Sequence, residues 1–312
     1  MAEQTAHFDM IIIGSGPAGF AAAIYGVRGG ASTALFGGVA PGGQLLLTTE
    51  IENYPGFADP VVGADLMEGM LKQSVRLGAT VFNTEIVAVN FTEHPFSLTA
   101  GDGRVYTAGS VIIATGARAR WLGLPSERKY IGKGVSGCAT CDGFFFRGRE
   151  VCVIGGGDSA AEDALFLTKF ASKVYLVHRR DKLRAAFRLQ EKLRANTKIE
   201  IIYDHLPEEI TGGARAAGLY IKNVRTGAVR RLETPGIFIA IGHAPATNIF
   251  AGKLDLDASG YIVTDDRLAA SVPGVFAAGD VMDTRYKQAV VAAGAGCMAA
   301  MEALLYLEEA KK

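Results

Sequence analysis

Hydrophobic residues gather in short runs that glycines interrupt, and this pattern predicts alternating strands and helices. Phe8–Ile13 is a short apolar run that Gly14 ends, and Pro17–Arg28 is alanine-rich with helical spacing. Thr33–Phe36 is a second short apolar run. Short apolar runs bounded by glycine are typical of buried strands, so the opening predicts strand, glycine turn, helix and strand, which is a βαβ unit.

The next region predicts the remainder of a first domain. Val62–Leu77 has helical spacing, Thr80–Thr107 alternates in short strands, and Val111–Ala114 is another buried apolar run. Asp102-Gly103 is the turn signal of a hairpin inside the alternating region.

The opening pattern then repeats. Val151–Ile154 predicts a strand, Gly155–Gly157 a turn, Ser159–Phe170 a helix and Lys173–Val177 a second strand. We interpret this repeat as a second copy of a nucleotide-binding unit, because only the βαβ unit recurs and no shorter period runs through the chain.

The last third predicts a small sheet and a closing helix. Leu219–Val224 and Val229–Glu233 have the pattern of a hairpin, and Ile237–Ile241 and Val275–Ala278 are short apolar strands. A long helix is expected from Gln288 to Glu309. The final strand and helix carry no nucleotide motif, so we expect them to return to the first domain.

The sequence therefore predicts an α/β fold with two dinucleotide-binding, Rossmann-like domains of the three-layer ββα type. A chain of 312 residues is longer than one ordinary core supports. We expect one domain from residues 1–116 and 247–312, with the second, residues 117–246, inserted in it. The two crossings, near 116–118 and 242–247, would lie side by side and form a hinge.

Composition excludes several classes of function. Lys+Arg and Asp+Glu balance at 32 each, so nothing favours nucleic acid or an acidic membrane as a partner. Apolar runs stop well short of the roughly 20 residues of a membrane span, and the polar start lacks a signal layout. These features predict a cytoplasmic protein.

The first glycine turn has the pattern G-x-G-x-x-G between a strand and a helix. Its first glycine permits the tight turn, its second lets backbone approach a pyrophosphate, and its third allows close helix packing. Amide groups at the helix start attract the phosphates. The predicted cofactor-binding residues of this turn are Gly14, Ser15, Gly16, Pro17, Ala18 and Gly19.

The second turn has the pattern G-x-G-x-x-A, and a basic cluster follows its second strand. An NAD-binding fold usually ends that strand with an acid, whereas here three guanidinium groups suit the 2′-phosphate of NADPH. A solvated basic face is the alternative. The residues expected to bind NADPH are Gly155, Gly157, Asp158, Ser159, His178, Arg179, Arg180 and Arg184.

The first turn is assigned to FAD, because a nicotinamide delivers two electrons as hydride and a flavin is the usual acceptor beside it. The second strand of this βαβ unit ends in Gly37-Gly38, without the acid that many FAD domains place there.

Cys138 and Cys141 form a Cys-x-x-Cys pair just before the second nucleotide unit. Two thiols at this spacing can close a small disulfide, and Asp142 beside them can carry a proton if a dry pocket raises its pKa. A zinc site is disfavoured because no second pair of ligands occurs. Cys152 and Cys297 are expected to be inert core residues.

Together these segments resemble the bacterial-type, low-molecular-weight, NADPH-dependent thioredoxin reductases along nearly the whole chain. The segments that carry the resemblance are Gly14–Gly19, Gly42–Gln44, Glu52–Gly56, Ala114–Gly116, Cys138–Gly143, Gly155–Ala160, His178–Arg180 with Arg184, and Gly279–Asp283.

The resemblance implies further cofactor contacts and an activity. The loop Gly37–Gln44 would hold FAD with Gln44 and Asn53, Asp280 would contact the ribityl chain, and Gln288 and Ala289 would face the flavin's pyrimidine side. The other FAD contacts expected are Gly38, Gly42, Gly43, Ala114, Thr115, Gly116 and Gly279. Members of the family are homodimers that pass electrons from NADPH through FAD and the dithiol to thioredoxin, with rotation of the inserted domain.

Other interpretations remain at this point. A ferredoxin-fed or otherwise NADPH-independent relative would not need the arginines, and a flavin-dependent ferredoxin or quinone reductase would not need the cysteine pair. A peroxiredoxin-reducing relative would usually carry an added redox domain. A dinucleotide-binding sensor without catalysis would leave both thiols without a role.

Overall fold

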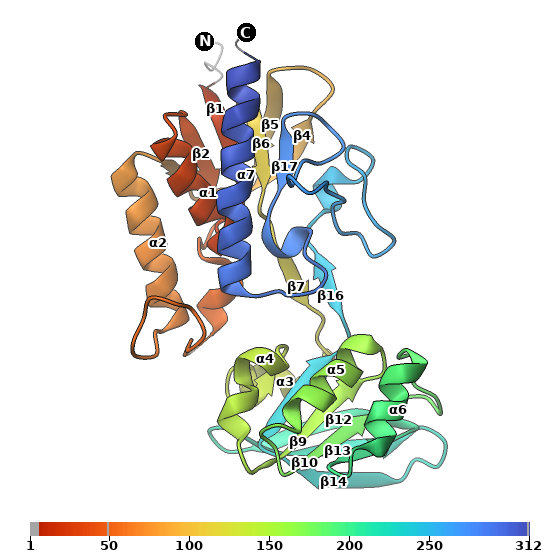
Figure 1. Ribbon diagram of the computed structural model, residues 1–312. Helices are drawn as coiled ribbons and strands as arrows, with labels where there is room; N and C mark the ends of the chain where they lie inside the picture. Colours follow the sequence, from red (N-terminus) through yellow and green to blue (C-terminus); the bar gives the residue numbers. More distant parts are fainter. Residues whose placement is uncertain (1–5, 49, 311) are drawn as a thin grey trace. The chain divides into compact units, whose positions relative to one another are not determined.

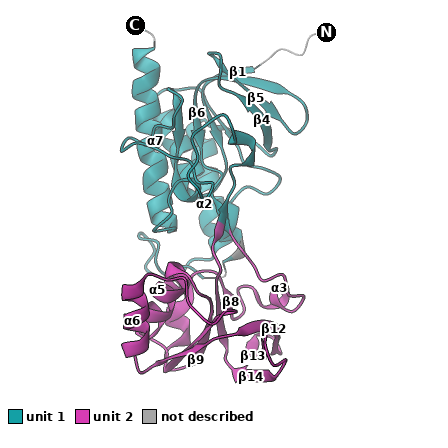
Figure 2. Ribbon diagram, turned by 90° about the vertical axis from the view of Figure 1, so that its right-hand side faces the viewer, with its two compact units in different colours: residues 1–118, 244–312 teal, residues 119–243 magenta. Residues whose placement is uncertain are grey.

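The computed structural model describes residues 6–48, 50–310 and 312, and it divides into two compact units (Figure 1). Figure 2 colours them separately: one contains the residues up to 118 and from 244 onward, the other residues 119–243. The second unit is thus an insertion in the first. The two crossings pair with each other, since β7 (Ala117–Ala119) and β16 (His243–Pro245) form a two-stranded sheet.

The first unit is built on a seven-stranded sheet in the order β3-β2-β1-β6-β5-β4, with β17 also paired to β6. The inner strands are parallel, whereas β4 and β5 add an antiparallel edge. Buried parallel strands are apolar on both faces, as Thr33–Phe36 is. The strands are β1 (Ala6–Ile13), β2 (Thr33–Phe36), β3 (Thr80–Phe82), β4 (Ile86–Asn90), β5 (Phe96–Ala100), β6 (Val105–Ile113) and β17 (Val275–Ala277).

Three long helices belong to this unit: α1 (Pro17–Arg28), α2 (Gly63–Leu77) and α7 (Ala289–Glu309), with short 3-10 turns η1 (Gly43–Leu47), η3 (Asn248–Phe250) and η4 (Gly279–Val281). By length and composition alone α7 is apolar enough to cross a membrane. Its alanine face packs in the core against α1. A Cβ atom at Gly296 would lie 2.0 Å from the carbonyl oxygen of Ala18, so glycine is required for this close packing.

The second unit has three layers. A parallel sheet in the order β11-β10-β9-β15-β8 carries α5 (Asp158–Leu167) and α6 (Phe187–Ala195) on one face. The antiparallel sheet β12-β13-β14 packs on the other face. The predicted α/β fold of two Rossmann-like domains, one inserted in the other, is confirmed. The strands are β8 (Val135–Ser136), β9 (Glu150–Gly155), β10 (Lys173–Val177), β11 (Ile199–Ile202), β12 (His205–Gly212), β13 (Ala216–Asn223), β14 (Val229–Glu233) and β15 (Gly236–Ala240).

Three short helical segments lie near the start of this unit. They are α3 (Glu127–Tyr130), α4 (Ala139–Asp142) and the 3-10 turn η2 (Gly143–Phe146). The Cys-x-x-Cys sequence spans the start and the body of α4, directly after the edge strand β8.

Candidate active site

The first glycine turn joins β1 to α1, and its three glycines have different surroundings. A Cβ atom at Gly14, where φ is +111°, would lie 2.2 Å from the carbonyl oxygen of Ala114, and one at Gly19 would lie 1.9 Å from that of Gly14. A Cβ atom at Gly16 would meet nothing within 4 Å. Gly14 and Gly19 are therefore needed for packing, whereas Gly16 borders open space beside the first turn of α1, which no side chain caps.

A loop after β2 is tied to this turn. The hydroxyl of Ser15 donates a hydrogen bond to the carbonyl oxygen of Gly37 at 2.8 Å and accepts one from the amide of Gly42 at 3.1 Å. The side-chain amide of Gln44 donates to the carbonyl oxygen of Ala117. These bonds hold the glycine-rich loop beside the open side of the turn.

Residues far apart in sequence meet at the same end of α1. A Cβ atom at Gly279 would lie 3.0 Å from the Cβ of Ala18, and the side-chain amide of Asn53 donates to the side-chain oxygen of Gln288 at 3.3 Å. Burial, aided by the nearby carboxylate of Asp283, raises the pKa of Asp280 to about 6. The first unit thus brings several expected FAD contacts into one region.

The second glycine turn joins β9 to α5 in the same way. A Cβ atom at Gly155 would lie 2.3 Å from the carbonyl oxygen of Ala240, whereas one at Gly157 would meet nothing within 4 Å. No side chain caps the start of α5. The carboxylate of Asp158 instead accepts a hydrogen bond from the amide of Ala186 at 2.7 Å.

The basic segment after β10 is held against this turn. The amides of Arg184 and Ala185 donate to the carbonyl oxygen of Gly156 at 2.6 and 3.1 Å. The side chains of Arg179, Arg180 and Arg184 are exposed. The segment therefore presents guanidinium groups to solvent beside the open position at the second turn.

His178 differs from its basic neighbours, because only 6% of it is exposed. Its ring lies where a side chain of Gly156 would be, 2.2 Å from the position of a Cβ atom there. Burial lowers the pKa of His178, and its Nε2 has no hydrogen-bond partner among the described residues. The imidazole supports the glycine turn from within, and the three arginines carry the exposed positive charge.

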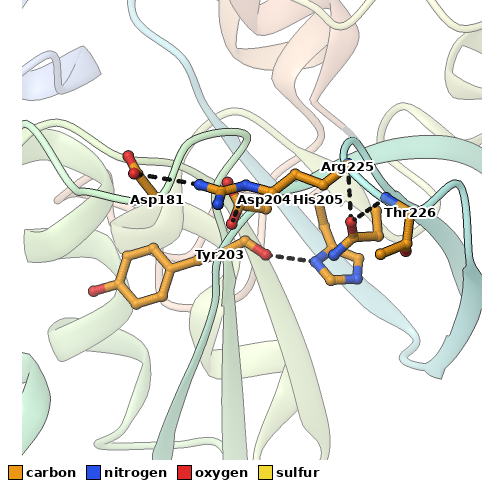
Figure 3. Close-up of polar contacts among 7 residues, drawn as sticks. Asp181, Tyr203, Asp204, His205, Arg225 and Thr226 are labelled. Atoms are coloured by element: carbon orange, nitrogen blue, oxygen red, sulfur yellow. Dashed lines mark hydrogen bonds and ion pairs between the residues drawn. The ribbon is translucent and has the colours of Figure 1, made fainter.

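The carboxylate of Asp181, beside the arginines, forms an ion pair with a residue in the turn between β13 and β14 (Figure 3). The guanidinium of Arg225 lies 3.3 Å from a carboxylate oxygen of Asp181 and 3.1 Å from one of Asp204. Because the carboxylate of Asp181 is paired with Arg225, it neutralises less of the positive charge of Arg180, the residue before it.

The two cysteines of the Cys-x-x-Cys sequence form a disulfide, with a Cα–Cα distance of 5.3 Å between Cys138 and Cys141. The sulfur of Cys138 accepts a hydrogen bond from the amide of Cys141 at 3.2 Å and lies 3.3 Å from the hydroxyl of Thr140. Cys138 is half-buried and Cys141 is exposed in the chain.

Comparisons with known proteins agree with this combination of sites. The family model described as pyridine nucleotide-disulphide oxidoreductase matches residues 8–296. Thioredoxin reductase of Rickettsia conorii is 50% identical over 304 residues, which cover 96% of this chain and 98% of that protein. The thioredoxin reductase of Streptomyces coelicolor is 47% identical over 301 residues, 96% of this chain and 94% of that one. The chain belongs to the thioredoxin reductase family.

Solved structures of the family have the same fold. The thioredoxin reductase from Giardia duodenalis superposes with a TM-score of 0.94 at 41% identity, covering 97% of this chain and 100% of that one. The one from Streptococcus pyogenes gives 0.93 at 41% identity, covering 98% and 100%. The disulfide between Cys138 and Cys141 is consistent with membership of this family.

Asp142 directly follows the pair. Burial raises the pKa of this half-buried carboxyl, and a hydrogen bond with the Ser136 hydroxyl opposes that rise. The other cysteines differ: Cys152 is fully buried, with its pKa raised by burial, and Cys297 lies 3.9 Å from the sulfur of Met301. No group of metal-binding side chains occurs among the described residues.

Two features near the pair have no counterpart in the sequence predictions. Ser136 accepts a hydrogen bond from the amide of Cys138, and Phe144 and Phe145 are 51% and 43% exposed directly after α4. The signal for the phenylalanines was present, because a run of three aromatic residues follows Gly143. A serine two positions before a cysteine gives no comparable signal.

Proposed function

We propose that this protein is an NADPH-dependent thioredoxin-disulfide reductase that carries two electrons from NADPH through FAD and Cys138–Cys141 to oxidised thioredoxin. The observation that carries the proposal is the disulfide between these cysteines in a chain with two open glycine turns. Family membership supplies FAD and NADPH as the cofactors.

FAD is assigned to the turn at Gly14–Gly19. Open space at Gly16 and uncapped amides of α1 fit a pyrophosphate, and the loop tied by Ser15 covers one side. Asn53, Asp280 and Gln288 are assigned to the flavin and its ribityl chain. Bound FAD supplies a carrier that accepts two electrons from a nicotinamide and releases them to a disulfide.

NADPH is assigned to the turn at Gly155–Ala160. Open space at Gly157 fits its pyrophosphate, and the exposed guanidinium groups of Arg179, Arg180 and Arg184 fit its 2′-phosphate. The arginines favour this assignment over an NADPH-independent relative.

Two electrons and two protons convert the disulfide into two thiols, and Asp142 is assigned to supply the second proton to the departing sulfur. One thiolate then attacks a sulfur of oxidised thioredoxin, the other thiol resolves the mixed disulfide, and reduced thioredoxin leaves as the Cys138–Cys141 bond re-forms.

A protein partner is consistent with the aromatic surface beside the pair. Phe144 and Phe145 are exposed, and the guanidinium of Arg147 lies 5.1 Å from the ring centre of Phe144. Exposed aromatic and arginine side chains are typical of protein interfaces. We assign them to contact with thioredoxin.

The cysteine pair and the NADPH turn belong to the same unit, yet both must exchange electrons with FAD. We propose that the inserted unit rotates about the paired segments β7 and β16. A covalent tie between the units tests this, since turnover that survives the tie would show that rotation is not required.

We also propose a cytoplasmic homodimer. Met298, Met301 and Leu305 on α7, with Tyr25 on α1, are between 43% and 54% exposed. Their spacing on α7 places them on one face, which a second copy would cover. Light scattering of the purified protein tests the dimer.

The decisive experiment is anaerobic mixing of the FAD-loaded protein with NADPH, followed by oxidised thioredoxin. We expect NADPH to bleach the flavin and thioredoxin to sustain NADPH oxidation. Cys138→Ser or Cys141→Ser should abolish the thioredoxin-dependent oxidation and leave the bleaching by NADPH intact. Cys297→Ser is the matched control and should retain activity. A flavin that NADPH fails to bleach would support an NADPH-independent relative instead. A Cys141→Ser enzyme with full activity on thioredoxin would refute the proposal.

A further inference from the structure

Arg225 is paired with two carboxylates that lie in different connections of the second unit (Figure 3). It belongs to the turn between β13 and β14, outside the glycine turn and outside the basic segment, residues 178–184. Its Nη2 lies 3.3 Å from a carboxylate oxygen of Asp181, in the basic segment after β10. Its Nε lies 3.1 Å from a carboxylate oxygen of Asp204, between β11 and β12. One guanidinium therefore links a separate hairpin to the basic segment.

Arg225 is held in this place from two sides. The amides of Arg225 and Thr226 both donate to the side-chain oxygen of Asn223 at 2.9 Å, which fixes the shape of the turn. Of the two carboxylates, that of Asp204 is the more sheltered, with 20% of its side chain exposed against 61% for Asp181. The sheltered carboxylate therefore anchors the guanidinium, and a different nitrogen of the same group pairs with Asp181.

The backbone around Asp204 binds the same two segments. Its amide donates to the carbonyl oxygen of Arg180 at 3.2 Å, and its carbonyl oxygen accepts from the amide of Val224 at 2.7 Å. The amide of His205 donates to the carbonyl oxygen of His178 at 3.0 Å. Asp204 has a φ of +59°, a conformation that is uncommon outside glycine and persists where the surrounding structure holds it. The basic segment and the hairpin turn are thus bonded to one connection.

Asp181 is the one acidic residue in the basic segment, and it stands among Arg179, Arg180 and Arg184. Carboxylates and phosphates are both bidentate partners of a guanidinium, so an unpaired Asp181 would compete with a bound phosphate for these arginines. In the part of the chain that the structure describes, Asp181 has an ion pair with Arg225 alone, and the three arginines have none. The pairing with Arg225 therefore leaves the arginines to the phosphate.

We propose that Arg225 is a positioning residue for NADPH binding, which keeps the carboxylate of Asp181 away from the arginines of the basic segment. It acts through Asp181 and strengthens only the binding of the 2′-phosphate. Because NADH lacks this phosphate, Arg225 raises the preference of the protein for NADPH over NADH. This inference rests on the proposed function, because the basic segment is assigned to NADPH only there.

The test compares adenosine 2′,5′-bisphosphate with adenosine 5′-monophosphate, two ligands that differ only in the 2′-phosphate, by calorimetric titration of the FAD-loaded protein. For Arg225→Ala we expect the Kd of the bisphosphate to rise about three- to tenfold, because Asp181 then pairs with the arginines. The Kd of the monophosphate should stay within about twofold, since it does not use them. In turnover, the KM for NADPH should rise with kcat unchanged.

A double-mutant cycle tests whether Arg225 acts through Asp181. Asp181→Asn removes the competing charge, so in that background Arg225→Ala should raise the Kd of the bisphosphate by less than about twofold. An undiminished rise in that background would overturn the inference, and so would an Arg225→Ala protein with an unchanged Kd. A rise of equal size for both ligands would show a general structural role and would overturn it as well.

The matched control is Arg231→Ala, which removes an exposed arginine of β14 that is paired with Glu233 on the same strand. Both of its Kd values should equal those of the unmodified protein. The two proposals fail differently. An unmodified protein that binds the two ligands equally refutes the NADPH assignment of the proposed function, whereas one that prefers the bisphosphate and keeps this preference in Arg225→Ala refutes only this inference.

Discussion

The side chains of Asn53 and Gln288 are joined by a hydrogen bond of 3.3 Å although they are 235 positions apart in the sequence. Gln288 precedes the first residue of α7, so the bond links the loop before α2 to the start of the last helix. Both residues are assigned to the flavin.

Loss of this link should weaken FAD binding without unfolding the first unit. A neutral hydrogen bond contributes about 0.5–1.5 kcal/mol, so Gln288→Ala should raise the Kd of FAD by up to about tenfold. Fluorescence titration of the apoprotein measures this. Gln73→Ala, an exposed glutamine on α2, is the control and should leave the Kd unchanged. Equal Kd values for both variants would remove Gln288 from the site.

The two open glycines offer a reciprocal test of cofactor assignment. Gly16→Ala and Gly157→Ala place a methyl group where no protein atom lies within 4 Å, so both proteins should fold. We expect Gly16→Ala to lose FAD and Gly157→Ala to keep FAD while its KM for NADPH rises at least about tenfold. Flavin absorbance of the purified proteins and steady-state kinetics measure the two effects. If Gly157→Ala lost FAD and Gly16→Ala kept FAD but had a raised KM for NADPH, the two cofactor assignments would have to be exchanged.

Asp158 is expected to act on NADPH through the basic segment. Its carboxylate holds the amide of Ala186, two residues beyond Arg184. Asp158→Ala should raise the KM for NADPH about three- to tenfold with little change in kcat, because the guanidinium is less well placed. Asp158→Asn keeps an acceptor oxygen and should restore the KM. A loss of kcat alone would place Asp158 elsewhere in the reaction.

Asp163 should make stability depend on pH. Burial, with the neighbouring charge of Glu162, raises its pKa from 3.8 to about 7. The folded state therefore binds the proton more tightly than the unfolded state, and stability falls as pH rises between these values. Asp163→Asn should be more stable than the unmodified protein at about pH 8, by the order of 2–4 kcal/mol, and similar to it near pH 4. Chemical denaturation measures this, with Asp266→Asn as an exposed control. A gain that persists unchanged at low pH would contradict the assignment.

Strongly patterned elements were predictable from sequence, and weakly patterned ones were not. The helix Pro17–Arg28 and the strands Thr33–Phe36 and Lys173–Val177 have their predicted bounds, because a glycine or proline marks an end or the apolar run is continuous. β12 was missed since its sequence contains Pro207 and two adjacent glutamates, and its register shifts near them.

The helix α6 was missed for a related reason, because only Leu193 of its residues is buried and its apolar stripe is short. The predicted helix Ser159–Phe170 ends instead at Leu167, where a turn takes the chain into β10.

The disulfide of Cys138 and Cys141 was predictable because spacing alone brings the two sulfurs together. The surroundings of His178 were not. Sequence places this residue at the end of a strand among exposed arginines, but the missing side chain of Gly156 leaves room for its ring in the interior. Such a contact depends on three-dimensional packing across two turns, which no local pattern records.

Because the second unit is inserted in the first, the two units become complete at different times during synthesis on the ribosome. The second unit is continuous in sequence and has every strand of its sheets once residue 243 has emerged. The first unit still lacks β17 and α7, whose alanines close its core, until the final residues are made. The segment synthesised in the middle can therefore fold before the segment that started synthesis, and a nascent chain cut before α7 should yield a protease-resistant fragment from the middle of the sequence only.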